Sequence, residues 1–397
     1  MDCHVTERLA RDSYRSYRLD AIFHGKKWDP QIYDRSTIAD RALILGSADW
    51  VELNNAAAEL YAETLAVETE LRRFAMRPDA KRFLPAKAWR RLRSLPDLEP
   101  RASVRLMRFD FHPTENGWRL SEVNSDVPGG LNESSLFPEI WPARSSNWTL
   151  PGHPGRTYVQ RVVERYGLTA RARVGLVHAT AFSDDWQHMA FLQELLAERS
   201  IEALGVSPTN VELNDGRMSF RGAELDAALR FFPGDWLLFS RWGEPWFTRH
   251  PVALSNPLHA LYSQNKFFPV VCAALGLEIP AWQRYLPHTS ELSVRDLFGA
   301  AGLLKPSFGR VGEDIARIAD LEPAKKVAVA LDLLLGTGLW IRQEQFMPKN
   351  LGSVAEPINA CVGVYCLDGE VIGGYGRLTS ERFVGMSAAD SPVFIAH

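Results

Sequence analysis

The sequence predicts a mixed α/β fold in which a helical N-terminal region precedes several small sheets. Three observations support this. Apolar residues recur at three- and four-residue steps between residues 38 and 93, as on one face of a helix. Segments typical of strand, helix and strand follow one another between residues 174 and 206. Pairs of alternating segments are joined by turn dipeptides at residues 108–124, 211–220 and 360–375. A chain of 397 residues is long enough for two or three such layers.

The first half of the chain is predicted to be a helical region followed by a hairpin and a surface connection. The helical pattern ends at Pro96 and Pro100. Two short apolar runs then flank Asn116 and Gly117, which predicts a hairpin between residues 108 and 124. From Pro128 to about Pro154 the chain is rich in proline, glycine and serine, so we expect it to run over the surface.

The second half begins with a predicted parallel βαβ unit. Residues 174–178 and 203–206 are the strands, and residues 184–199 form the helix between them. A hairpin on Asp215 and Gly216 follows. The remaining predicted elements are strands at 227–232, 303–305 and 340–346, a helix at 264–275, and a hairpin at 360–375 on Asp368 and Gly369.

The composition excludes several classes of protein. A net charge of −3 provides no positive field for nucleic acid, and the basic segment 87–108 is typical of a solvated helix face. Four cysteines without a CxxC spacing predict reduced thiols. The longest apolar stretch, 327–341, is interrupted by Asp332 and two glycines, and the N-terminus lacks a signal-peptide pattern. We therefore expect a cytoplasmic protein without a membrane segment.

Polar residues occupy hairpin positions where a sheet normally packs its core. A three-residue loop with Gly117 left-handed would pair Asp110 with Glu122 and Arg108 with Asn124, whereas a two-residue turn would send the carboxylates to opposite faces. Facing carboxylates repel unless a cation lies between them. Oxygens of Asp110, Glu122 and Asn124 suit Mg²⁺. The alternative is an exposed polar face with ordinary cross-strand pairs.

A second motif is a predicted strand that ends at Lys305 and leads into a glycine-spaced loop. Its residues Ser307, Gly309 and Gly312 would let backbone N–H groups approach phosphate, and Lys305 would neutralise its charge. The loop lacks the Walker A pattern, and an ordinary turn is the alternative. Lys266, at the start of a predicted helix, could reach a phosphate or face solvent.

Two further motifs have both a functional and a structural interpretation. Gln343 and Glu344 lie in a predicted strand whose polar positions could bind an adenine edge and ribose, or could line an amphipathic edge strand. Arg377 follows three glycines and could contact an anion, or could be a surface arginine. The histidines show no metal-ligand spacing, and no nucleophile elbow is present.

Taken together, these motifs resemble the synthetase part of glutathionylspermidine synthase and its shorter stand-alone relatives, which are described as acid–amine ligases of the ATP-grasp superfamily. The resemblance spans about Arg108 to His397. The stretches that carry it are Arg108-x-Asp110, Glu122-x-Asn124 with Asp126 and Pro128, Asn265-Lys266, Lys305-Pro306 with Gly309, Arg310 and Gly312, Gln343-Glu344 before Phe346, residues 375–377, and residues 391–395.

The resemblance implies an ATP-grasp fold of permuted order with a small pre-ATP-grasp, Rossmann-like layer. Residues 1–397 would form one unit, divided into an N-terminal helical region (1–99), a metal-binding hairpin (100–150), a βαβ substrate layer (151–255) and a nucleotide lobe (256–397). Asp110, Glu122 and Asn124 would hold magnesium, and Arg108 would contact the transferred phosphoryl and acyl groups. The implied ATP ligands are Lys266, Lys305, Ser307, Gly309, Gly312, Gln343 and Glu344, and Arg377 would contact substrate.

The implied activity is an ATP- and magnesium-dependent ligation of a small-molecule or peptide carboxylate to an amine through an acyl phosphate. The family's amidase domain is absent from this sequence, so hydrolysis of the conjugate is not expected. Val127, Gly129 and Gly130 stand where the family often has a hydroxyl-rich, substrate-binding run, so glutathione and spermidine do not follow as substrates. The alternatives are a phosphotransferase and a non-catalytic nucleotide- or peptide-binding homologue. The sequence assigns no general base and no oligomeric state.

Overall fold

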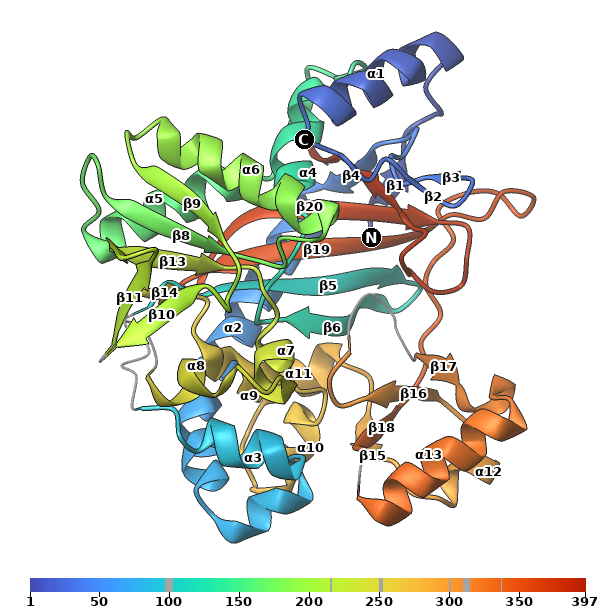
Figure 1. Ribbon diagram of the computed structural model, residues 1–397. Coiled ribbons are helices and arrows are strands. Elements are labelled where there is room, and N and C mark those ends of the chain that lie inside the picture. Colours follow the sequence, from blue (N-terminus) through green and yellow to red (C-terminus); the bar gives the residue numbers. More distant parts are fainter. Residues whose placement is uncertain (97–102, 215, 250–252, 300, 310–314, 337) are drawn as a thin grey trace.

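The largest sheet combines a hairpin from the first half of the chain with one from its C-terminal end (Figure 1). A computed structural model describes residues 1–96, 103–214, 216–249, 253–299, 301–309, 315–336 and 338–397. The strand order is β21-β20-β19-β5-β6, with antiparallel neighbours throughout. The bounds are β5 Leu106–Thr114, β6 Gly117–Asn124, β19 Asn359–Leu367, β20 Glu370–Thr379 and β21 Ala389–Ser391.

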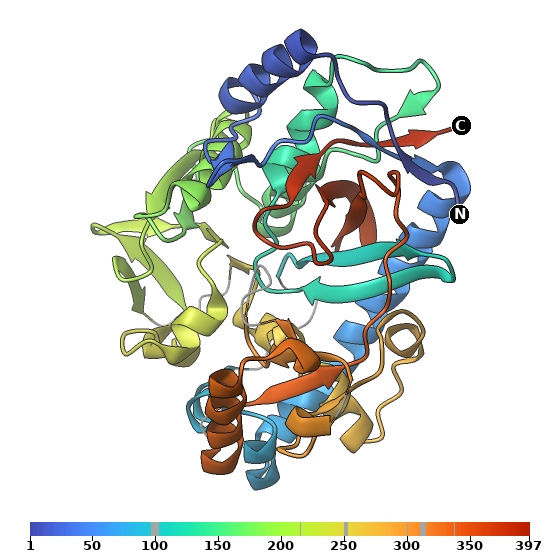
Figure 2. The same cartoon turned by 90° about the vertical axis from the view of Figure 1, so that its right-hand side faces the viewer.

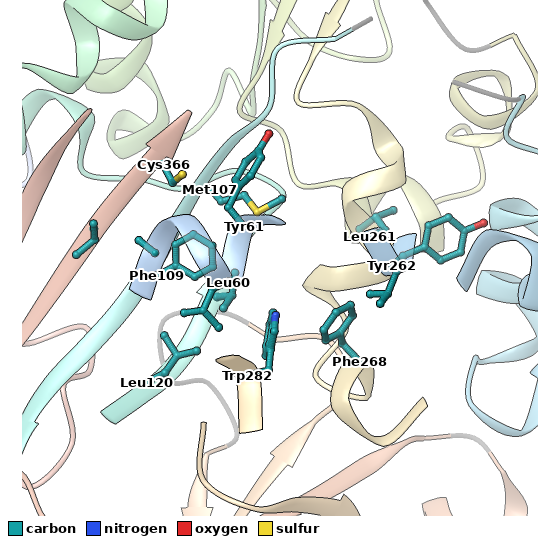
Figure 3. Close-up of a cluster of buried hydrophobic side chains, with 14 of the residues drawn as sticks. Leu60, Tyr61, Met107, Phe109, Leu120, Leu261, Tyr262, Phe268, Trp282 and Cys366 are labelled. Carbon is teal, nitrogen blue, oxygen red and sulfur yellow. The ribbon is translucent and has the colours of Figure 1, made fainter. Parts of the chain in front are cut away.

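One face of this sheet packs on helices. Helix α2 (Ser47–Ala75) and the short helices α9 (Leu261–Gln264), α10 (Phe268–Ala274) and α11 (Pro280–Tyr285) cover it. Figure 3 shows Phe109 and Leu120 of the sheet beside Leu60 of α2 and Trp282 of α11. Because strand side chains alternate, burying Phe109 on this face sends its neighbours Arg108 and Asp110 to the other.

The N-terminal region is helical from Ser47 on, but the predicted helical start at residue 38 is wrong. Strand β4 (Leu43–Gly46) is fully buried and pairs in parallel with β22 (Val393–Ala396). They form a four-stranded sheet with β1 (Cys3–Val5) and β7 (Trp148–Thr149). An uninterrupted apolar run such as Leu43-Ile44-Leu45 suits a strand buried on both faces as well as a helix. Other N-terminal elements are α1 Arg11–Phe23, β2 Gln31–Ile32, β3 Arg35–Ser36, η1 Pro78–Arg82 and α3 Ala86–Leu92.

The predicted surface connection at residues 128–154 is also wrong in part. It contains helix α4 (Leu131–Ile140), in which Asn132, Glu133, Ser134 and Ser135 are all buried. Their polarity suggested a loop, yet their side chains find partners inside the protein. For example, the Ser135 hydroxyl accepts a hydrogen bond from the Gly155 N–H at 3.0 Å. Tertiary contacts thus overrode the local signal.

The predicted βαβ layer is confirmed. Strands β8 (Arg173–Val177) and β9 (Glu202–Val206) are parallel and are joined by α6 (Ser183–Ala197). Strand β13 (Ala227–Arg230) pairs in parallel with β8. The next hairpin is also confirmed, although Asp215 in its turn lies outside the described residues. The layer is completed by α5 Pro154–Tyr166, β10 Val211–Asn214, β11 Arg217–Phe220, β12 Ala223–Leu225, α7 Gly234–Phe239, α8 Glu244–Thr248 and β14 Leu254–Ser255.

A second antiparallel sheet lies beneath the β5–β6 hairpin in both Figure 1 and Figure 2. Its order is β15-β18-β16-β17. The helix predicted to start at residue 264 is interrupted, because Asn265 is extended and α10 begins only at Phe268. No described helix is long and apolar enough to cross a bilayer. The remaining elements are β15 Thr289–Glu291, β16 Leu303–Pro306, β17 Ala316–Arg317, β18 Trp340–Gln343, α12 Asp296–Gly299, α13 Pro323–Leu335, η2 Leu258–Ala260 and η3 Ile318–Asp320.

Candidate active site

The β5–β6 hairpin gathers its four polar residues on the face away from α2. Asp110 pairs with Glu122, and Arg108 pairs with Asn124. This is the predicted pairing, and Gly117 has the predicted left-handed conformation, with φ +92°. The hairpin therefore places two carboxylates, a guanidinium and an amide on neighbouring positions of one surface.

The predicted three-residue loop is wrong, because Thr114 pairs with Gly117 and leaves a two-residue turn. The extra residue that produces the pairing is Ser121. The register shifts between Asp110 and Phe111, so Ser121 has no partner on β5 and forms a bulge. The sequence contained a signal for it. Trp118, Leu120 and Val123 all lie in the core, and the three-residue step from Leu120 to Val123 breaks the alternation of a regular strand.

Arg108 and Asp110 form a buried bidentate ion pair. Arg108 Nε lies 2.6 Å from Asp110 Oδ1, and its Nη2 lies 2.8 Å from Oδ2. Asn124 Nδ2 also donates to Asp110 Oδ2 at 3.0 Å. Burial alone would lower the pKa of Arg108, but Asp110 raises it well above its ordinary value. Arg108 therefore remains a fixed positive charge, and it stacks over the Tyr375 ring at 5.1 Å.

Two lysines, one between α9 and α10 and one in β16, face the same hairpin. Lys305 Nζ donates to the backbone oxygen of the bulge residue Ser121 at 3.1 Å, so the bulge supplies an anchor for this side chain. Lys266 Nζ donates to the Gly309 carbonyl at 2.9 Å. Burial lowers the pKa of Lys305 to about 8. The charged form of Lys305 is therefore disfavoured by burial, and a negatively charged partner beside it would stabilise that form.

Glu122 lies among positive charges. Burial by itself would raise its pKa, but Lys266, Lys305, Arg108 and Arg377 together lower it below the ordinary value. Four cations face two carboxylates here, which leaves two positive charges in excess. Such a surplus, in a partly enclosed site, complements a polyphosphate.

Three cavities meet at Glu122. One lies between the two antiparallel sheets, encloses about 820 Å³ and is lined by Lys305, Gln343 and Phe346. A smaller one, of about 400 Å³, extends past Lys266 to Trp282. The third is an open cleft of about 1550 Å³ between the hairpin and the βαβ layer. Arg108, Asn124 and Arg377 are among the residues that line this cleft.

The remaining predicted residues are only partly drawn into these cavities. Gln343 lines the first two, and its Nε2 donates to Thr289 Oγ1 at 3.0 Å. Glu344 is exposed and lines none of the three. Ser307 is buried, and its carbonyl accepts from the Lys266 N–H at 2.8 Å. Gly309 meets Lys266 as described above, and Gly312 lies outside the described residues.

Arg377 points into the cleft from β20. Its Nη2 donates to the Gly385 carbonyl, while its buried Nε has no hydrogen-bond partner among the described residues. Burial would lower its pKa, but Tyr375 and Asp390 raise it. An unused donor on a charged guanidinium leaves one hydrogen bond available to an anionic ligand.

A further charged cluster lies in the cleft wall, and no sequence motif indicated it. Lys27 is 4% exposed, and its Nζ lies 2.9 Å from Asp29, 3.0 Å from Glu133 and 2.8 Å from Asp390. The Tyr375 hydroxyl donates to Asp390. These residues come from distant parts of the chain, so no local motif connects them.

The hairpin carries the ligand types of a magnesium site, two carboxylates and an amide, although both Asp110 oxygens bond Arg108 in this structure. Mg²⁺ prefers carboxylate and amide oxygens and leaves positions for phosphate oxygens and water. Asp110 and Glu122 are cross-strand neighbours, and Asn124 already contacts Asp110. Among the described residues, no three His, Cys, Asp or Glu side chains are grouped so that they could hold a metal ion, and the hairpin itself contributes two carboxylates and an amide. Asp110, Glu122 and Asn124 are the predicted metal ligands, and a metal there would have to displace the Arg108 hydrogen bonds to Asp110.

Two solved structures are similar to this chain to different degrees, and the first supports the architecture described above. A glutathione synthetase-like effector from Globodera pallida, solved in its apo form, superposes with a TM-score of 0.57 at 12% identity, covering 98% of both chains. A gamma-glutamylcysteine synthetase candidate from Methylobacillus flagellatus has a TM-score of 0.48 at 13% identity, covering 82% of this chain and 87% of the other. A search of curated proteins found no match.

The fold is therefore an ATP-grasp-related α+β fold, as the resemblance implied. The family described as glutathionylspermidine synthase preATP-grasp matches residues 16–393, which is nearly the whole chain. The chain belongs to this glutathionylspermidine synthase family.

Proposed function

We propose that the protein is an ATP- and Mg²⁺-dependent ligase that joins a carboxylate to an amine through an acyl phosphate. The observation that carries the proposal is the position of Glu122, which lines both the cavity between the sheets and the large cleft. A nucleotide in that cavity and an acid in the cleft would meet at this residue. Family membership supports the same chemistry.

The side chains around Glu122 have the charges that phosphoryl transfer requires. Lys266 and Lys305 would contact the ATP phosphates, and Gln343, Ser307 and Gly309 would complete the nucleotide site. Glu344 and Gly312, the other predicted ATP ligands, add no support, because the first lies outside the cavities and the second outside the described residues. Bound magnesium, held by Asp110, Glu122 and Asn124, would neutralise charge on the transferred phosphoryl group. Catalysis of this kind depends mainly on positioning and on electrostatic stabilisation.

The cleft is the proposed site of the acid and the amine. Arg108 lies between the two sites and would hold the acid's carboxylate beside the terminal phosphate, and Arg377 has a free donor for the same anion. The volume of about 1550 Å³ includes space open to solvent, so the acid could extend out of the cleft. Glutathione with spermidine is the first substrate pair to test, because the family carries their names.

Hydroxylamine trapping tests the proposal. The protein is incubated with ATP, Mg²⁺, a panel of acids and hydroxylamine, because an acyl phosphate yields a hydroxamate whereas a phosphorylated alcohol does not. Glu122→Gln and Asp110→Asn should each reduce hydroxamate at least about 100-fold. Glu115→Gln, in the exposed turn of the same hairpin, is the matched control and should leave the rate unchanged.

The other outcomes separate the alternatives. ADP release without hydroxamate would favour a phosphotransferase. Tight ATP binding with no turnover across the panel would favour a non-catalytic homologue. Hydroxamate formation that is unaffected by both hairpin substitutions would contradict the assignment of the site.

A further inference from the structure

The cluster around Lys27 lies in the cleft wall but has no part in the phosphoryl transfer described above. Lys27, Asp29, Glu133 and Asp390 all line the cleft, as do Arg108 and Glu122. The cluster holds one ammonium and three carboxylates. A buried group of this composition cannot be neutral when every member is ionised.

One oxygen in the cluster is unused. Glu133 is 5% exposed, and its Oε1 accepts from Lys27 Nζ at 3.0 Å. Its Oε2 is buried and has no hydrogen-bond partner among the described residues. By contrast, Asp390 is engaged by both Lys27 and Tyr375. Glu133 thus keeps an acceptor atom at a residue that borders the cleft, where a ligand can supply the missing donor.

Charge repulsion tunes this carboxyl group. Burial raises the pKa of Glu133 to about 7; Lys27 opposes the shift, while Asp390 and Asp29 add to it. The same three carboxylates raise the pKa of Lys27 well above its ordinary value, although burial would lower it. Lys27 therefore stays protonated, and Glu133 exchanges its proton near neutral pH.

The cluster is connected to the reaction centre through Tyr375. The Tyr375 ring lies under the Arg108 guanidinium at 5.1 Å, and its hydroxyl reaches Asp390. Glu133 belongs to the first turn of α4, directly after Gly130, and Arg108 donates to the neighbouring Gly129 carbonyl at 2.7 Å. Two independent links thus join the residue proposed to hold the acid to the elements that hold Glu133.

We propose that Glu133 is the proton acceptor for the amine substrate and that its free Oε2 receives the ammonium donor. This inference rests on the proposed ligase function and adds the general base that the sequence did not assign. An alkyl amine resembles lysine and is almost wholly protonated near pH 7. It cannot attack until it loses a proton, which is a task for a base whose pKa is close to the working pH.

The step balances as follows. The ammonium transfers one proton to the Glu133 carboxylate, and the neutral amine attacks the carbonyl carbon of the acyl phosphate. The C–N bond forms, the bond from carbon to the phosphate oxygen breaks, and the second amine proton leaves with phosphate. Glu133 then releases its proton to solvent. Neither an oxidant nor a further reactant is needed.

Two nucleophiles distinguish this role from a structural one. Hydroxylamine is already a neutral base near pH 7, whereas spermidine is protonated. In Glu133→Gln we expect hydroxamate formation to persist within about threefold and amide formation with spermidine to fall about 100-fold. The acid in both assays is the one from the panel that gives the fastest wild-type hydroxamate. Comparing variants at one pH cancels the titration of each nucleophile.

Glu139→Gln is the matched control, because Glu139 is an exposed residue of the same helix. It should leave both rates unchanged. Lys27→Met provides a second test that keeps Glu133. In the wild type we expect the amide rate to rise with pH near pH 7. Removing the ammonium should move this rise to higher pH, since Lys27 holds the pKa of Glu133 down. The melting temperature of each variant is measured as well, to establish whether that variant is folded.

Each remaining result counts against the inference. Equal retention of amide and hydroxamate formation in Glu133→Gln would overturn the proton-acceptor role. An equal loss of both in a folded variant would show that Glu133 serves the earlier step instead. An unmoved pH profile in Lys27→Met would also overturn it. Failure of the wild type to give any hydroxamate would remove the ligase function itself, and this inference with it.

Discussion

Replacing Asp126 by alanine should destabilise the protein strongly, because Asp126 is the partner of a fully buried arginine. The side chains of Arg230 and Asp126 are 0% and 1% exposed and form an ion pair. Asp126 Oδ2 also accepts from the Gly234 N–H at 2.7 Å. Without the carboxylate, the acceptors left to Arg230 among the described residues are neutral carbonyls, those of Phe232 at 2.8 Å and Asn256 at 3.0 Å.

The expected cost is about 3 to 5 kcal/mol, the usual penalty for leaving one buried charge uncompensated. A chain of 397 residues has an unfolding entropy of about 0.8 kcal/mol per kelvin, so the melting temperature should fall by about 4 to 6 °C. Scanning calorimetry measures this directly. The pair joins the segment after β6 to strand β13, so it helps to hold the cleft's two walls together.

Two further variants sharpen the test. Asp126→Ala combined with Arg230→Met removes both charges, so much of the lost stability should return. Glu202→Ala breaks a pair with Arg173 whose side chains are about half exposed, and it should cost no more than about 1 kcal/mol. If Asp126→Ala lowered the melting temperature by less than about 1 °C, the reasoning about the buried charge would be refuted.

Three other predictions follow from the described geometry. Because burial lowers the pKa of Lys305 to about 8, its ammonium is present below that pH and lost above it. KM for ATP should therefore rise several-fold from pH 7 to 9. Lys305→Met should abolish this dependence of KM on pH. Gly130→Ala should lower the melting temperature more than Gly117→Ala. Both glycines have positive φ, but of the two only Gly130 would place a Cβ against a ring, 2.8 Å from Tyr375 Cζ. Equal decreases in melting temperature would contradict this. Burial raises the pKa of all four cysteine thiols, to about 12 in Cys3, Cys272 and Cys366. The native protein should therefore not react with a disulfide reagent at pH 8, whereas the denatured protein should react at Cys3, Cys272, Cys361 and Cys366.

Elements specified by nearby residues were predictable from the sequence. The βαβ layer and the hairpin on Asp368 and Gly369 are examples, since periodicity and turn chemistry act over a few residues. Strand β4 was not predictable, because its partner β22 lies near the other end of the chain. Helix α4 was missed because buried partners, rather than an apolar face, hold its polar residues.

The candidate site shows the same division. The pairing of Asp110 with Glu122 could be predicted from alternation within one hairpin, although the bulge was assigned to the wrong residue. The apolar step from Leu120 to Val123 would have located it. The cluster of Lys27, Glu133 and Asp390 could not be predicted, because only the folded chain brings these residues together.

The parallel pairing of β4 with β22 has a consequence for biosynthesis. Ribosomes deliver the chain from its N-terminus, so Leu43 to Gly46 emerge long before Val393 to Ala396 can reach them. Until then the edge of β4 that pairs with β22 remains unpaired, and Lys27 lacks the carboxylate of Asp390. The nascent polypeptide therefore cannot complete the β4–β22 sheet or the Lys27 cluster during most of its translation. A stalled or truncated product should be a target for chaperones or proteases.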